Sequence, residues 1–98
     1  MRSIVSKDDC CFICAEVYKK YVWTDTEEHH VFFGTGKREL SDEDGLTVRL
    51  CKAHHREGPE AAHKNHLADM YLKVVAQAKY EETHTREEFM KRYGKSYL

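Results

Sequence analysis

The stretch EHHVFFGTGKRELSDEDGLTVRLCKAHH, residues 28–55, decides how this chain folds. It opens on Glu28-His29-His30 and closes on Cys51-Lys52-Ala53-His54-His55, so four histidines stand in two short blocks. The apolar run at 31–33 ends at a Gly-Thr-Gly turn, and residues 46–50 alternate apolar and polar as a half-buried strand does. We therefore expect two strands joined by an acidic loop of about a dozen residues.

The flanking segments predict a knuckle before the strands and helices after them. Residues 10–14 form a tight turn that brings two thiols together, and residues 24–27 form a solvated connection. Apolar residues recur at helical spacing at 67, 70/71, 74 and 78, which predicts a long helix over about 60–82 that begins near Pro59. Residues 85–88 form a capping box for a last short helix, and Gly94 is its expected end.

Length and composition describe one small domain with a marginal core. A 98-residue chain with 41% hydrophobic and 34% charged residues is globular, and a bound metal would stabilise it. No apolar run has membrane-spanning length and the N-terminus lacks the apolar core of a signal peptide, so we expect a cytosolic protein. The formal net charge of −1 gives no long-range attraction for a polyanion, so nucleic-acid binding would depend on local basic residues and a bound cation.

Two chelating pairs predict a structural zinc site. A Cys-x2-Cys pair and a Cys-x2-His pair have the spacing at which a tight turn directs two ligands at one ion, and zinc takes four such ligands. The expected ligands are Cys11, Cys14, Cys51 and His54. Cys10 competes with Cys11, and spacing alone does not separate His54 from His55. Two disulfides and four unligated buried thiols are the alternatives, of which disulfides are disfavoured in a reducing compartment.

The adjacent residues His29 and His30 predict two different chemical roles. Adjacent side chains of an extended segment point to opposite faces, so one imidazole can bind a divalent cation while the other takes a proton from water. His55 and His63 are candidates to complete the cation site. Arg38 and Arg49 flank it and are candidates for phosphate contacts.

The order of these motifs resembles the HNH endonucleases of the ββα-metal (His-Me finger) superfamily, and more closely the small HNH-like proteins of bacteriophages and prophages. The resemblance covers residues 10–66 and the Gly94–Leu98 ending. It implies an α+β fold with a zinc-stapled ββα-metal core over 10–66 and a helical extension over 67–98. It also implies that His30 is the general base, that His29 is a ligand of the catalytic ion, and that the final His of the motif is His55.

The chain departs from the family pattern at two places. The central Asn has no clear counterpart, with Asp44-Gly45 or Leu46 near its place, and residues 31–34 replace the usual apolar-Pro step. His63 is then either an extra histidine or the last ligand of the catalytic ion.

The function expected from these motifs is cleavage or nicking of DNA with a divalent cation such as Mg²⁺, Mn²⁺ or Ni²⁺. The expected location is the cytoplasm of a bacterial or phage-infected cell. A homodimer through the 60–82 helix is compatible with a site that cuts one strand. The alternative is a catalytically weak zinc-binding module that binds nucleic acid or a protein partner, for example as a phage anti-defence inhibitor.

Overall fold

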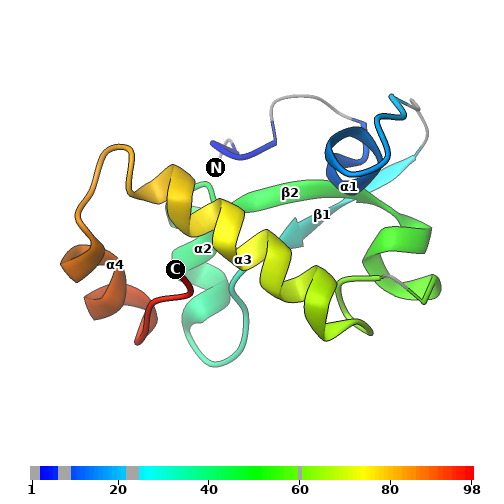
Figure 1. Cartoon of the computed structure of the whole chain (residues 1–98). Helices are drawn as coiled ribbons and strands as arrows, with labels where there is room; N and C mark the ends of the chain where they lie inside the picture. The colour runs from blue at the N-terminus through cyan, green and yellow to red at the C-terminus, as the bar shows by residue number, and fades with distance from the viewer. Residues whose placement is uncertain (1–2, 7–9, 22–24, 60) are drawn as a thin grey trace.

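The computed structural model describes residues 3–6, 10–21, 25–59 and 61–98 of the chain. They form a small α+β fold with a two-stranded sheet and helices around it (Figure 1). The elements in order are α1 (Phe12–Glu16), β1 (Thr26–His30), α2 (Lys37–Glu43), β2 (Thr47–Cys51), a π-helical turn η1 (Ala53–Glu57), α3 (His66–Tyr80) and α4 (Arg86–Tyr93). In Figure 1, α1 and η1 lie at the end of the sheet where β2 finishes, and α2 and α4 lie at the other end.

The two strands are antiparallel, with His29 opposite Val48 and His30 opposite Thr47. The strand expected at 46–50 is confirmed as β2, but the first strand was placed wrongly. It occupies Thr26–His30, so part of the expected solvated connection is strand, and the apolar run follows its end. The reason is packing: the Phe32 side chain leaves the sheet to enter the core, where its ring centroid lies 4.6 Å from that of Tyr93.

The connection between the strands is not the extended acidic loop we expected, because it contains helix α2. Gly36 precedes α2 with a φ of 79°, a left-handed conformation that glycine adopts without strain. Ser41 is fully buried; its hydroxyl accepts from the Phe32 N–H at 3.3 Å and donates to the Leu46 carbonyl at 2.6 Å. Because many residues of this segment are acidic, the sequence did not predict a helix there. In the structure, α2 lies beside the end of β1.

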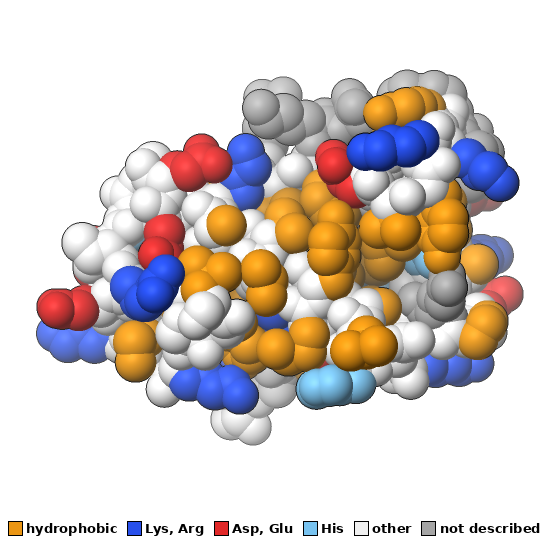
Figure 2. All heavy atoms as spheres, viewed as in Figure 1, with side chains coloured by type: hydrophobic (Ala, Val, Ile, Leu, Met, Phe, Trp, Pro, Cys, Tyr) orange, Lys and Arg blue, Asp and Glu red, His pale blue; other side chains and the backbone are white. Residues whose placement is uncertain are grey.

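The long helix starts later than expected. α3 begins at His66, after Asn65 caps it by accepting from the Leu67 and Ala68 N–H groups at 2.9 and 3.1 Å. The predicted apolar stripe is also mostly on the wrong face, since Leu67 is 78% exposed. The buried face carries Leu72, Ala76, Gln77 and Tyr80. Figure 2 shows hydrophobic side chains gathered at the surface along α3.

Helix α4 matches its sequence signals. The capping box is confirmed, with Glu88 N–H donating to Thr85 Oγ1 at 3.1 Å and Thr85 N–H to Glu88 Oε1 at 2.8 Å, and Gly94 ends the helix at φ 94°. Among the described residues, no helix has both the length and the apolar character needed to cross a membrane. Thr24 of the predicted connection and Glu60 of the predicted helix start lie outside the described residues.

Candidate metal centres

Three thiols and one imidazole converge at the end of β2. Cys11 is the N-cap of α1 and Cys14 lies in its first turn, so both sulfurs point to the same side; Cys51 ends β2 and His54 lies in η1. His54 Nδ1 is 3.5 Å from Cys11 Sγ, 3.4 Å from Cys14 Sγ and 3.3 Å from Cys51 Sγ. The sulfurs of Cys14 and Cys51 are 4.0 Å apart. These are the four residues that the chelating pairs predicted.

The spacing of this cluster fits a tetrahedral ion. With zinc–sulfur and zinc–nitrogen bonds of about 2.3 and 2.0 Å, tetrahedral angles separate sulfur from nitrogen by about 3.5 Å and two sulfurs by about 3.8 Å. All four cysteines lie in the described residues, and none of them forms a disulfide there. Burial, together with the adjacent Cys11 and Cys51, raises the pKa of the Cys14 thiol to about 12, and a cation among the sulfurs would favour its thiolate form. The group can therefore hold a metal such as zinc.

The two alternatives that the sequence left open are separated by this geometry. Cys10 is buried beside a pocket that Val5 and Phe12 also line and does not belong to the cluster, and His55 belongs to a second cluster. The His54 ring is covered by Tyr18, which stacks on it with ring centroids 5.6 Å apart.

The second cluster consists of His29 from β1, His55 from η1 and His63 from the segment before α3. Their candidate ligand nitrogens all lie within 4.8 Å of one another. His55 Nε2 and His63 Nε2 are 3.1 Å apart, close to the separation of about 3.0–3.3 Å that two nitrogens take on one cation. His29 and His55 are buried, whereas His63 is exposed.

The imidazole of His29 is neutral throughout the physiological pH range. Burial, with a smaller contribution from the positive charge that His63 and His55 can carry, lowers its pKa to about 3. Burial also lowers the pKa of His63. Within the described part of the chain, the buried Nε2 of His29 has no hydrogen-bond partner. A cation bound between the three rings would satisfy this nitrogen, so the donor set fits a divalent metal.

Glu27 orients the ring of His55 in this cluster. Its Oε1 lies 2.7 Å from His55 Nδ1, and this hydrogen bond lowers the Glu27 pKa, so the carboxylate is ionised and the proton is on Nδ1. Nε2 of His55 then turns its lone pair toward His63, the arrangement by which carboxylates orient metal-ligating histidines. Sequence reasoning missed Glu27, although its spacing of two from His29 on a strand places both on one face.

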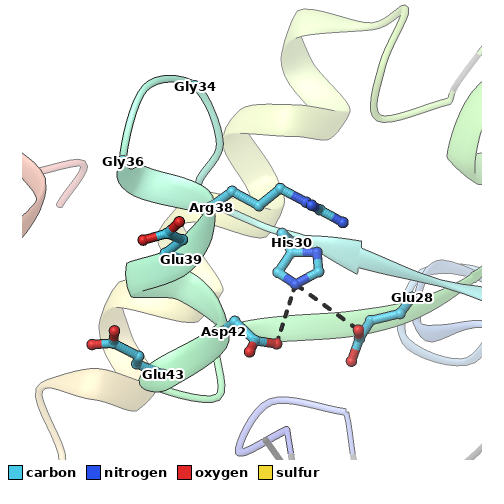
Figure 3. Close-up of a pocket in the computed structure, with 8 residues that line it drawn as sticks. All are labelled: Glu28, His30, Gly34, Gly36, Arg38, Glu39, Asp42 and Glu43. Atoms are coloured by element: carbon cyan, nitrogen blue, oxygen red, sulfur yellow. Dashed lines mark hydrogen bonds and ion pairs between the residues drawn. The ribbon is translucent and has the colours of Figure 1, made fainter.

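His30 points to the opposite face of β1, as alternation along a strand predicts. Its Nε2 lies 3.3 Å from Asp42 Oδ1 of α2 and 3.9 Å from Glu28 Oε1 (Figure 3). Because an ionised carboxylate only accepts, the proton is on Nε2, and Nδ1 keeps its lone pair. The ring borders a cavity of about 650 Å³, whose other walls include Arg38, Glu39 and Glu43. Sequence reasoning missed Asp42, because the segment that carries it was expected to be a loop.

Comparisons with protein-family models, with curated proteins and with solved structures gave no match for this chain. Any chemical role of the His29–His55–His63 cluster and of His30 is therefore inferred from their geometry.

The two arginines proposed for phosphate contacts differ in their surroundings. Arg38 is exposed on α2 at the His30 cavity. Arg49 of β2 instead links the two strands. Its Nε donates to Thr26 Oγ1 of β1 at 3.0 Å, and a terminal nitrogen donates to the Thr26 carbonyl at 2.6 Å. Of the two, Arg38 is the one that lines the His30 cavity.

Proposed function

We propose that this protein is a metal-dependent DNA endonuclease or nickase built on a zinc-stapled ββα-metal core. The observation that carries the proposal is the convergence of His29, His55 and His63 on one face of β1, with His30 directed to the other face. One strand thus supplies a neutral metal ligand and, next to it in sequence, an imidazole oriented by a carboxylate.

Three histidines would hold the catalytic cation, such as Mg²⁺, Mn²⁺ or Ni²⁺. When bound, the cation supplies stabilisation of the negative charge that develops on the phosphate and the leaving oxygen. His29 meets the requirement for a ligand because burial keeps it neutral, and Glu27 holds His55 in the tautomer that leaves Nε2 for binding. His63 would complete the set from the exposed side.

His30 would act as the general base. Asp42 holds the Nε2–H and so aims the ring, while Nδ1 is left to take a proton from an attacking water. The resemblance assigns an orienting role to a central Asn that this sequence lacks. In this proposal Asp42 performs that role, since it lies within hydrogen-bonding distance of the base.

Zinc at Cys11, Cys14, Cys51 and His54 would be structural. Four protein ligands close the coordination shell of a tetrahedral ion and leave no position for a substrate. The ion would join the N-terminal knuckle to the end of β2 and to η1, and η1 carries His55.

Cleavage of supercoiled plasmid tests the proposal. Wild-type protein with Mg²⁺, Mn²⁺ or Ni²⁺ should nick the plasmid, EDTA should stop it, and His30→Ala should lower the rate by about 10²–10⁴-fold with zinc content unchanged. His84→Ala is the matched control, because His84 stacks on Tyr80 and does not border the His30 cavity. Equal cleavage by wild type and His30→Ala would refute the assignment of the base.

A second candidate, a zinc-stapled binding module, is favoured by the charge around His30. The cavity is lined by Glu28, Glu39, Asp42 and Glu43 against the single Arg38, an unfavourable surface for phosphates unless a cation is bound. Absence of cleavage with every cation, from protein that carries zinc, would establish this candidate over the enzyme. Its partner would then be a nucleic acid or another protein.

The remaining expectations stay predictions. DNA as the substrate, a bacterial or phage-infected cytoplasm as the location, and a homodimer through α3 follow from the sequence and its resemblance. For the homodimer, α3 offers Leu67 and Tyr71 as exposed apolar side chains.

A further inference from the structure

Two buried side-chain atoms in the described residues have no hydrogen-bond partner, and both belong to neighbours of His63. They are Nε2 of His29 and Oδ1 of Asp69. The ring centroids of His29 and His63 are 4.9 Å apart, and Asp69 lines one small cavity together with His63 and Phe33. Because an unpaired buried oxygen is costly, its position beside a candidate cation site calls for an explanation.

Asp69 lies in the first turn of α3, four residues before Lys73. Its Oδ2 accepts from Lys73 Nζ at 2.8 Å, and only 14% of its side chain is exposed. An ion pair at this spacing supports a helix, and a carboxylate suits its first turn. That ordinary role accounts for Oδ2 and Lys73, but it leaves Oδ1 buried without a partner.

The charges of this pair reach the histidine cluster with opposite signs. The carboxylate of Asp69 raises the pKa of His63 against the effect of burial, and the ammonium of Lys73 acts on His29 in the opposite direction. Helix α3 therefore places a negative side chain within electrostatic range of His63 and a positive one within range of His29.

We propose that Asp69 is a positioning residue of the His29–His55–His63 site, whose free carboxylate oxygen, beside His63 at one small cavity, stabilises a divalent cation there through its negative charge and its electrostatic effect on His63. The inference rests on the cation site of the proposed function. Asp69 lies outside the group of ligand atoms within 4.8 Å of one another, so it acts through its charge and through His63. His63 needs such support because it is the exposed ring of the three, while Glu27 already fixes His55.

The test is a titration of full-length protein, preloaded with one equivalent of zinc, with Co²⁺ followed by its visible absorption and by calorimetry. Asp69→Asn should weaken Co²⁺ binding about 10–100-fold, the usual effect of losing a carboxylate behind a ligand. Lys73→Gln should strengthen it, because this change removes a positive charge near His29 and keeps a donor for Asp69.

The opposite signs separate this role from a helix-supporting one. If the pair only supports α3, both variants lower the melting temperature measured in EDTA and leave Co²⁺ affinity and absorption unchanged, which would overturn the inference. Wild-type protein that binds no Co²⁺ beyond the thiol site would also overturn it. The titration contains no DNA, so Asp69-dependent Co²⁺ binding without plasmid cleavage would support this inference and count against the nuclease alone.

Discussion

At the scale of single residues, the pleat of β1 gives two adjacent histidines different chemistry. His29 turns inward, where burial makes the protonated ring costly, and His30 turns toward Asp42, whose carboxylate fixes one ring nitrogen. Glu27 shares the inner face with His29 and supports His55. The alternation of four consecutive residues thus sets the positions of the proposed ligand, the proposed base and the carboxylate behind His55.

The low pKa of His29 predicts acid sensitivity. The unfolded chain binds a proton at this residue near pH 6.5, whereas the folded protein binds it only near pH 3, so stability falls as the pH falls through this interval. Between pH 7 and pH 5 the loss from this residue is about 2 kcal/mol. Urea unfolding at both values should show that loss in wild type, and His29→Gln should reduce it by a similar amount. The same loss in both proteins would contradict the prediction.

The residues of the thiol cluster could be predicted from sequence, and the carboxylates could not. The start of α1 places Cys11 with Cys14, and the junction of β2 with η1 places Cys51 with His54, so local spacing contains nearly all of the information. Glu27 and Asp42 act only because β1 extends back to Thr26 and a helix occupies the connection. Their role depends on where elements lie, which a short spacing rule does not include.

At the scale of elements, α2 depends on α4 for its position. Asp44, which caps the C-terminal end of α2, accepts from Arg92 Nε at 2.7 Å and from the Tyr93 hydroxyl at 2.6 Å. Tyr93 is fully buried, so its hydroxyl has to be satisfied inside the protein. Through α2, this contact also supports Asp42 and the orientation of His30.

Asp44→Ala should therefore destabilise the fold by about 1–3 kcal/mol, because it leaves a buried hydroxyl without an acceptor. Asp44→Asn keeps an acceptor for Tyr93 while removing the charge beside Arg92, and we expect a smaller loss. Urea unfolding at pH 7 measures both. Equal losses in the two variants would show that the ion pair with Arg92, not the Tyr93 hydroxyl, holds α4.

Elements with complete local signals were predicted, and those set by packing were not. The capping box of α4 and the alternation of β2 are local, and both predictions are confirmed. The start of α3 depends on Asn65, and its buried face depends on the aromatic core that α4 supplies around Phe89 and Tyr93. The apolar pattern alone therefore predicted that a helix is present but not which of its faces is buried.

At the scale of the whole molecule, the thiol cluster adds a polar junction to the apolar packing that joins the N-terminal knuckle to the rest, in which Ile13 is buried in the core. The sheet has only two strands, and a pair of strands is marginally stable without further support. Cys11 and Cys14 come from α1, Cys51 from β2 and His54 from η1, so one ion bound to all four would link three separate elements.

Zinc removal should therefore lower the melting temperature strongly. If free zinc is about 1,000 times its dissociation constant, binding contributes about 4 kcal/mol, and its loss lowers the melting temperature of a domain this size by roughly 15–30 °C. Calorimetry with and without a chelator measures the shift. Cys51→Ser should lose one equivalent of zinc and melt at the chelated temperature, whereas Cys10→Ser should keep its zinc, since Cys10 lies outside the cluster. Freshly purified protein without zinc, or a melting temperature that a chelator does not change, would show that zinc does not stabilise the fold. The fold would then depend on the hydrophobic core, whose aromatic rings come from the segment after β1, from α3 and from α4.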